Sequence, residues 1–227
     1  MVFCAFFGML FSMPLQAQTS TDAIGSGTTW LLNARYGFGT WAFNAPPDPL
    51  QTEFTADDYR KTYIRDTLEA AKTLKALTIS VDEYQSTLDW VAFFPLEATD
   101  HLAQKIYILA GVGRDSSQAL SSLLELRNSA GGFSGAKGYS VSNNLDTAFA
   151  MQALKAANYS DTTLVGQSLN FLTTNQNADG GWGYNPGEGS NVYITSLTLK
   201  ALSLYNSVFI NQDSINRASA FLLAHQN

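Results

Sequence analysis

The strongest constraint on the fold is the segment Gln176–Trp182, QNADGGW, which separates two stretches of helical periodicity. Its adjacent glycines, Gly180 and Gly181, can adopt backbone angles that a Cβ atom forbids, so a helix can end there and the chain can reverse. Trp182 can then bury its indole against the reversal. This pattern predicts helical hairpins joined by glycine turns.

Partial copies of this segment occur earlier, as RYGFGTW at Arg35–Trp41 and RNSAGGF at Arg127–Phe133. Gly132 and Gly181 are 49 residues apart, and a period just below fifty is typical of a helical-hairpin repeat. We expect the repeated motif to be structural, and its residues are Gly39, Trp41, Gly131, Gly132, Phe133, Gln176, Asp179, Gly180, Gly181 and Trp182.

One copy of the motif is degenerate. Trp41 and Phe133 are 92 residues apart, which is twice 46, so one repeat lies between them. We interpret Leu88–Pro95, LDWVAFFP, as this copy, with Trp90 kept and the glycines lost, and we expect a helix over Ala98–Ala110.

The helices fall into two sets, and almost no stretch alternates as a half-buried strand would. Amphipathic helices with one apolar face are expected outside, and smaller, more continuously apolar helices inside. We predict an all-α fold in which the inner helices include Asp66–Leu77, Asp146–Ala156 and Thr195–Leu204. Capping residues predict the helix starts, namely Ser80 with Glu83, Asp66 with Glu69, Asp115 with Gln118, and Asp161 and Asp213 alone.

The N-terminus differs from the rest of the chain. Val2–Leu15 is apolar and uncharged, and Leu15–Ala17 offers a cleavage point, so residues 1–17 are predicted to be a secretory signal peptide and 18–227 the mature domain. Because no Lys or Arg precedes the apolar segment, we expect the natural start to lie upstream; a buried N-terminal helix is the alternative. Cys4, the only cysteine, would be removed.

The net charge limits the classes of partner that the chain can bind. The chain carries a formal charge of −6 and no cluster of Lys or Arg, so the basic surface that nucleic acid requires is missing. We expect an exported protein, periplasmic, at the cell surface or extracellular, with no nucleic-acid partner and no membrane span after signal cleavage.

Gln176, Gly180 and Trp182 fit QxxxGxW, the QW repeat of squalene and hopene cyclases. Roughly residues 24–227 resemble the prenyltransferase and squalene oxidase repeat family of α/α toroids, most closely its secreted bacterial members of undefined activity. Such a toroid implies about six hairpins, whereas about four and a half are visible, and the final AHQN resembles the opening of another turn. The resemblance therefore implies a domain that is incomplete at its C-terminus.

Asn143–Ala148, NNLDTA, aligns with the DxDDTA of squalene-hopene cyclases, whose middle aspartate protonates the alkene. Leu145 replaces that proton donor and Asn143 replaces the first aspartate, so only Asp146 remains. We expect Asp146 to cap the following helix through the amides of Ala148 or Phe149.

Other candidate sites compete with structural interpretations. Exposed Trp41, Trp90 and Trp182 could bind sugars. Carboxylates at inner helix starts could converge for acid and base chemistry, or could simply be solvated acids favoured at helix N-termini; they are Asp66, Glu69, Glu97, Asp100 and Asp146.

No metal or cofactor is expected. Asn175, Asn177 and Asp179 imitate half of a calcium loop, but Pro186 occupies its closing position. Zinc of the prenyltransferase kind would need a cysteine that the mature chain lacks.

These observations favour a noncatalytic, exported toroid module, part of a larger envelope or extracellular protein, that binds a ligand or partner on its inner face. The alternative is an enzyme on the same toroid, either a terpenoid cyclase or a polysaccharide lyase or glycosidase that uses the inner-helix carboxylates. A structural spacer without a pocket is a third possibility.

Overall fold

The computed structural model describes residues 20–36, 39–41 and 56–226, and the side chains of Ser20 and residues 56–62 are not considered. The chain divides into two units, residues 1–34 and 35–227. The described part of the first unit is one helix, α1 (Ser20–Asn33), and its continuation to Ala34. The predicted signal peptide and Asn227 lie outside the described residues.

The second unit consists of helices and their connections. Its described residues contain no β-strand, so the predicted all-α fold is confirmed. The elements are α2 (Ala56–Ala76), the 3-10 helix η1 (Val81–Tyr84), α3 (Gln85–Phe93), α4 (Thr99–Gly111), α5 (Ser117–Leu124), α6 (Asn144–Ala156), α7 (Thr162–Thr174), α8 (Val192–Ser203) and α9 (Gln212–Ala224).

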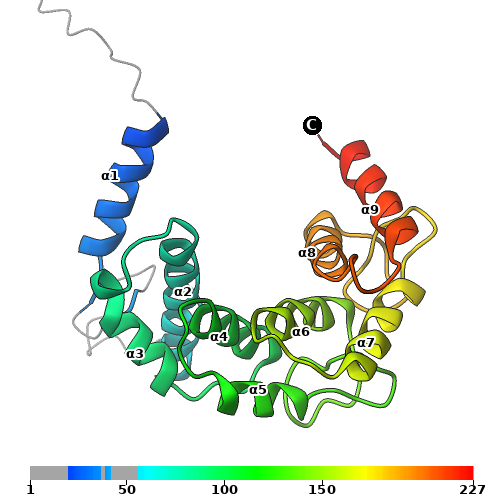
Figure 1. Ribbon diagram of the computed structural model, residues 1–227, viewed down its shortest axis with the longest axis horizontal. Coiled ribbons are helices and arrows are strands. Elements are labelled where there is room, and N and C mark those ends of the chain that lie inside the picture. The colour runs from blue at the N-terminus through cyan, green and yellow to red at the C-terminus, as the bar shows by residue number, and fades with distance from the viewer. Residues whose placement is uncertain (1–19, 37–38, 42–55, 227) are drawn as a thin grey trace, which may run out of the picture. The chain divides into compact units, whose positions relative to one another are not determined.

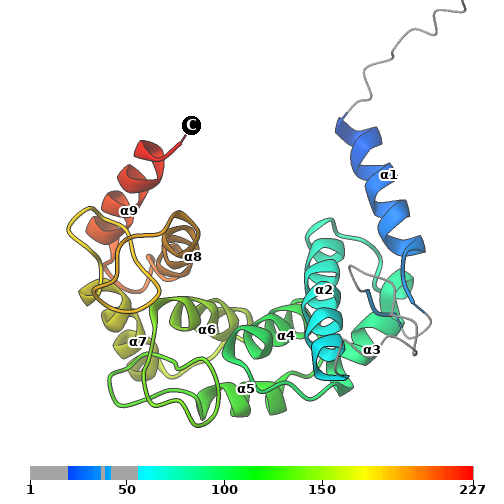
Figure 2. The same cartoon turned by 180° about the vertical axis from the view of Figure 1, so that it is seen from behind.

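The helices of the second unit form an inner and an outer row. In the inner row, α2 packs against α4, α4 against α6, and α6 against α8. Each outer helix, α3, α5, α7 and α9, packs against the inner helix that precedes it, as Figures 1 and 2 show from opposite sides. The described part of this unit therefore holds four helical hairpins.

A buried threonine on each inner helix anchors the loop packed against it. The Thr195 hydroxyl accepts a hydrogen bond from the Trp182 backbone N–H at 3.0 Å, and the Thr147 hydroxyl accepts one from Phe133 at 2.9 Å. In α4, the Thr99 hydroxyl instead donates to the Ser134 carbonyl. The four threonines have no exposed surface and are spaced by 32, 48 and 48 residues: Thr67, Thr99, Thr147 and Thr195.

The glycine turns press directly on the next outer helix. Gly131 and Gly180 have φ values of +92° and +91°, which side chains with a Cβ rarely adopt. A Cβ on Gly180 would lie 2.5 Å from the Arg217 carbonyl oxygen of α9, and one on Gly131 would lie 2.8 Å from the Gln167 carbonyl oxygen of α7. These positions need glycine for both the backbone angle and the close approach.

Several helix starts differ from the predictions. Asp161 caps α7 by accepting from the Leu164 N–H at 3.0 Å, as expected. Asp66 is not a start, because α2 already begins at Ala56 and its periodicity continues through that residue. The helix η1 begins directly after Ser80, as expected, although the Ser80 side chain makes no cap bond. Asp115 lies two residues before α5, and its carboxylate accepts from the Ser117 N–H at 3.0 Å. Asp213 lies inside the first turn of α9 and not at its cap.

The predicted degenerate turn is a helix. Trp90 lies within α3 and stacks on Phe94, with ring centroids 4.5 Å apart. It is therefore not equivalent to Trp41 or Trp182, and that interpretation is wrong. The following inner helix α4 is present, as the sequence predicted for Ala98–Ala110.

Candidate functional site

The inner helices line a common pocket. It measures about 60 Å³, and its lining comes from α2, α4, α6 and α8. Four of the lining side chains occupy equivalent places, each five residues after a buried threonine: Lys72, Gln104, Gln152 and Lys200. We call this surface the inner-face pocket; the rings of Tyr107 and Phe149 also contribute to it.

The two glutamines lie deep in the inner-face pocket. Gln104 and Gln152 are only 7% and 9% exposed. The Gln152 amide donates to the carbonyls of Ala148 and Leu197 at 3.3 and 3.4 Å. The Gln104 Oε1 atom is buried and has no hydrogen-bond partner among the described residues. A buried polar atom left unpaired costs about 1–3 kcal/mol, so this amide can gain from a donor supplied by a ligand.

At the N-terminal ends of the inner helices, Asp146 is held in a polar cluster. Asn143 caps α6 by accepting from the Asp146 N–H at 2.8 Å, and the Asn143 amide donates to the Asp146 carboxylate. The Asn143 amide also donates to the Tyr184 hydroxyl at 3.2 Å. The cap of α6 is therefore Asn143, and the expected capping role of Asp146 is wrong.

Burial governs the protonation of this cluster. Asp146 is 5% exposed, and this desolvation raises the pKa of its carboxyl, with a smaller upward contribution from the charge of Asp100. Burial likewise raises the pKa of the Tyr184 hydroxyl, and the Asp146 charge adds to the shift. The charge of Asp100 thus acts on the Asp146 carboxyl.

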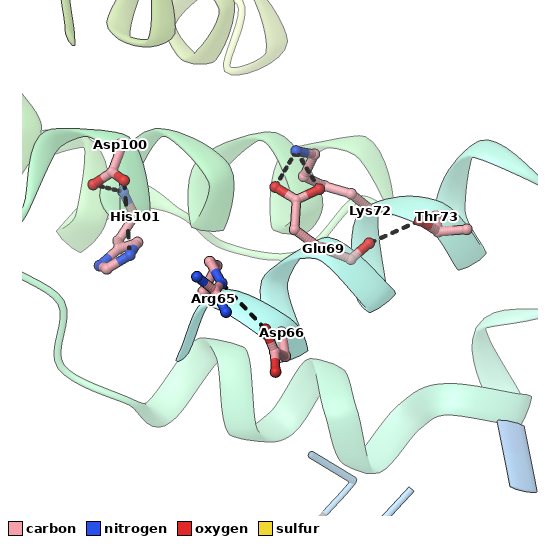
Figure 3. Close-up of polar contacts among 7 residues, drawn as sticks. All are labelled: Arg65, Asp66, Glu69, Lys72, Thr73, Asp100 and His101. Atoms are coloured by element: carbon pink, nitrogen blue, oxygen red, sulfur yellow. Dashed lines mark hydrogen bonds and ion pairs between the residues drawn. The ribbon is translucent and has the colours of Figure 1, made fainter. Parts of the chain in front are cut away.

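The other candidate carboxylates have local partners. Figure 3 shows Asp66 paired with Arg65 at 3.2 Å, Glu69 with Lys72 at 2.8 Å, and Asp100 beside His101. Glu97 lines a different pocket, of about 310 Å³, between α3, α4 and α5. The structure therefore does not gather the five carboxylates into one cluster.

The tryptophans do not form a sugar-binding platform. Trp41 and Trp182 are 6% and 0% exposed, so neither ring can stack on a ligand, and the structural role expected for the motif fits both residues better than the sugar-binding alternative. The Trp182 ring is part of the hydrophobic core. Trp90 is half-buried on an outer helix, away from the inner-face pocket.

The repeat motif joins neighbouring hairpins. The Gln176 amide donates to the carbonyls of Gly180 at 2.8 Å and of Ser214, in α9, at 2.9 Å. The Asp179 carboxylate accepts from the Gly181 N–H and the Ser190 hydroxyl at 3.0 and 2.7 Å. Asp179, a candidate in the calcium-like segment, thus serves the turn itself. Within the described ranges, no three His, Cys, Asp or Glu side chains gather as metal ligands would.

The family profile described as prenyltransferase alpha-alpha toroid domain matches residues 62–226. The chain belongs to this family. The match covers all four hairpins apart from the beginning of α2, so the toroid resemblance noted in the sequence is confirmed. No curated protein matches the chain significantly. None of the helices that the structure describes combines the length and apolar character needed to cross a membrane.

The glutamines of the inner-face pocket were missed in the sequence because no motif marks them. A signal was nevertheless present. Gln104 and Gln152 are 48 residues apart, as are Gln152 and Lys200, so an alignment of the inner helices on their buried threonines would have placed these polar residues in one row.

Proposed function

We propose that this protein is a noncatalytic toroid module whose inner face binds a hydrophilic ligand. The observation that carries the proposal is the row formed by Lys72, Gln104, Gln152 and Lys200, because four successive inner helices each place a polar group in one pocket. Amide and ammonium groups offer directional hydrogen bonds, and the few such groups in a pocket fix the orientation of its ligand.

The same row argues against a polyprene substrate. A cyclase must present an apolar, aromatic inner face and a strong acid to its hydrocarbon, whereas half of the residues that line this pocket are lysines or glutamines. Leu145 also occupies the aligned position of the proton donor. A hydrocarbon would leave the buried Gln104 Oε1 atom without a partner, at a cost of about 1–3 kcal/mol.

Calorimetric titration with defined probes tests the proposal. We expect tetragalacturonate or cellotetraose to bind and squalene not to bind. Gln104→Leu and Gln152→Leu should each weaken binding of the oligosaccharide by about fivefold to tenfold, because each substitution removes about one hydrogen bond. Gln85→Leu, on the exposed surface of α3, is the control and should bind normally. Preferential binding of squalene would contradict the proposal.

A second function is favoured by one observation, the buried Asp146 carboxyl beside Asp100 and Tyr184. Its raised pKa suits a general acid, as a polysaccharide lyase or glycosidase would need. Turnover of an oligosaccharide that Asp146→Asn abolishes, with the fold intact by circular dichroism, would establish this enzyme and overturn the noncatalytic assignment.

We further propose that the module is exported as part of a larger envelope or extracellular protein. The uncharged apolar segment Val2–Leu15 supports export. N-terminal sequencing of the mature protein from its native host should begin at residue 18. A mature protein that retains this segment would contradict cleavage.

A further inference from the structure

Two lysines from helices that are not neighbours in the inner row meet over one aromatic ring. The Lys75 Nζ atom of α2 lies 3.9 Å from the ring centroid of Tyr107 in α4, and the Lys200 Nζ atom of α8 lies 5.7 Å from it. The separation of the two nitrogens therefore cannot exceed the sum of these distances. We call Lys75, Lys200 and Tyr107 the lysine pair and its ring.

The lysine pair has no direct carboxylate partner within the described part of the chain. Among the described residues, neither Lys75 nor Lys200 has a carboxylate oxygen within 4.0 Å. Lys72, which lines the same pocket, is paired with Glu69 at 2.8 Å. Two ammonium groups that approach the same ring repel each other, and an anion bound between them would offset that repulsion.

The position of each lysine at a helix end has a simple electrostatic explanation, but that explanation does not account for both side chains reaching the same ring. Lys75 and Lys200 both lie in the last turn of a helix, where the helix dipole favours a cation. That effect does not require side chains from α2 and α8 to reach the same ring. The ring itself contributes a weak attraction to each ammonium. Tyr107 and Lys200 line the inner-face pocket, and the Lys75 ammonium approaches it through the Tyr107 ring.

The path of Lys75 is shaped by a glycine. A Cβ on Gly111, the last residue of α4, would lie 1.8 Å from Lys75 Cε and 2.6 Å from Nζ. A side chain at this position would displace the end of the lysine from its present place beside Tyr107. The arrangement is therefore set by the backbone of α4 as well as by the lysine.

We infer that the lysine pair binds a carboxylate of an acidic oligosaccharide, with Tyr107 beneath it and the pocket glutamines beside it. This inference deepens the proposed function and rests on it. A pocket of about 60 Å³ holds about two water molecules at about 30 Å³ each, which suits a carboxylate better than a whole sugar ring. The amides of Gln104 and Gln152 can then bind the neighbouring sugar hydroxyls.

Titration with tetragalacturonate and with its neutral methyl ester tests the inference. The acid should bind at least tenfold more tightly than the ester, and this preference should shrink as salt is raised from 50 to 500 mM. Lys75→Met and Lys200→Met should each weaken binding of the acid by about tenfold and leave binding of the ester unchanged, because each substitution removes one charged donor. Equal binding of acid and ester would overturn the lysine-pair site while leaving the proposed function standing. Absence of binding by both would overturn the site, and the cellotetraose and squalene titrations would then decide the proposed function separately.

Two further variants separate the pair from general electrostatics. Gly111→Ala keeps every charge but displaces the end of Lys75, and it should weaken binding of the acid about as much as Lys75→Met does. Lys155→Met is the matched control, because a single lysine there lies 5.3 Å from the ring centroid of Tyr205; it should change the acid affinity less than twofold. Equal losses in Lys155→Met and Lys75→Met, or equal competition by inorganic phosphate and by free galacturonate, would overturn the assignment.

Discussion

Two hairpins of this chain supply hydrogen-bond donors to the carbonyls at the end of an outer helix in different ways. After α7, the Trp182 indole N–H, supplied by the glycine turn, donates to the Leu172 carbonyl at 2.7 Å. After α3, the Lys105 ammonium, supplied by the next inner helix, donates to the carbonyls of Ala92 and Phe94 at 2.8 and 2.9 Å. The last carbonyls of a helix lack intrahelical donors. The Trp182 indole and the Lys105 ammonium each supply such a donor.

The difference shows what a glycine turn contributes beyond a reversal. The turn brings a neutral aromatic donor, whereas the shorter connection relies on a buried ammonium, and this burial lowers the pKa of Lys105. The equivalent residues of α6 and α8, six after the buried threonine, are Ala153 and Ala201, both without exposed surface. A hairpin can thus do without its turn when the adjacent helix replaces a small residue with a long donor.

The largest expected effect comes from breaking a glycine turn. Gly180→Ala should lower the free energy of unfolding by about 3 kcal/mol or more, because a left-handed backbone costs about 1–2 kcal/mol and the new Cβ would clash with the Arg217 carbonyl. Gly187→Ala is the matched control: its φ is +82° but nothing lies within 4 Å, so it should lose only about 1 kcal/mol. Urea denaturation measures both, and equal losses would refute the close approach.

The next effect concerns the short connection. Lys105→Met keeps the length of the side chain but leaves the part-buried carbonyls of Ala92 and Phe94 without their donor, so we expect the free energy of unfolding to fall by about 2 kcal/mol. Lys137→Met, an 82% exposed side chain, should change stability by less than about 0.5 kcal/mol. Chemical denaturation at pH 7 compares them, and an unchanged Lys105→Met protein would show that α3 needs no donor from α4.

The long connection should respond less. Trp182→Phe keeps an aromatic ring, as Phe133 does in the preceding copy, but removes the indole donor to Leu172. We expect a loss of about 1 kcal/mol, whereas Trp30→Phe, at a 70% exposed position, should have no effect on the melting of this unit. A loss larger than that of Lys105→Met would reverse the ranking of the two connections.

The smallest effect is a dependence on pH. Because burial raises the pKa of Asp146 above its ordinary 3.8, the folded state holds that proton more tightly than the unfolded state. Its stabilising contribution is complete below pH 3.8 and is lost as the pH rises through the raised pKa. Asp146→Asn should therefore gain stability relative to the native protein between pH 4 and 7. Urea melts across this range test the sign, and a relative loss would contradict it.

The sequence predicted the turns better than the inner surface. Glycines with a following aromatic residue leave a local pattern, so Gly131, Gly180 and Trp182 could be placed in advance. The start of α2 could not, because Asp66 looks like a cap yet lies in a helix whose earlier residues continue the same periodicity. A local capping rule does not detect that a helix has already begun upstream of the capping residue.

The site was less predictable for a related reason. Asn143 and Asp146 both lie in a recognisable segment, but which of them caps α6 depends on the backbone at residue 143. Lys75, Tyr107 and Lys200 share no motif, since three separate helices bring them together. Their meeting is a property of the hairpin arrangement and not of any local segment.

The central claim is that the inner face is the binding surface. The most direct test follows the side-chain amide NMR signals of the glutamines during titration with tetragalacturonate. The account predicts that the Gln104 and Gln152 signals shift together along one binding curve while those of Gln85 and Gln118 stay in place. Shifts confined to the outer-helix glutamines would contradict it.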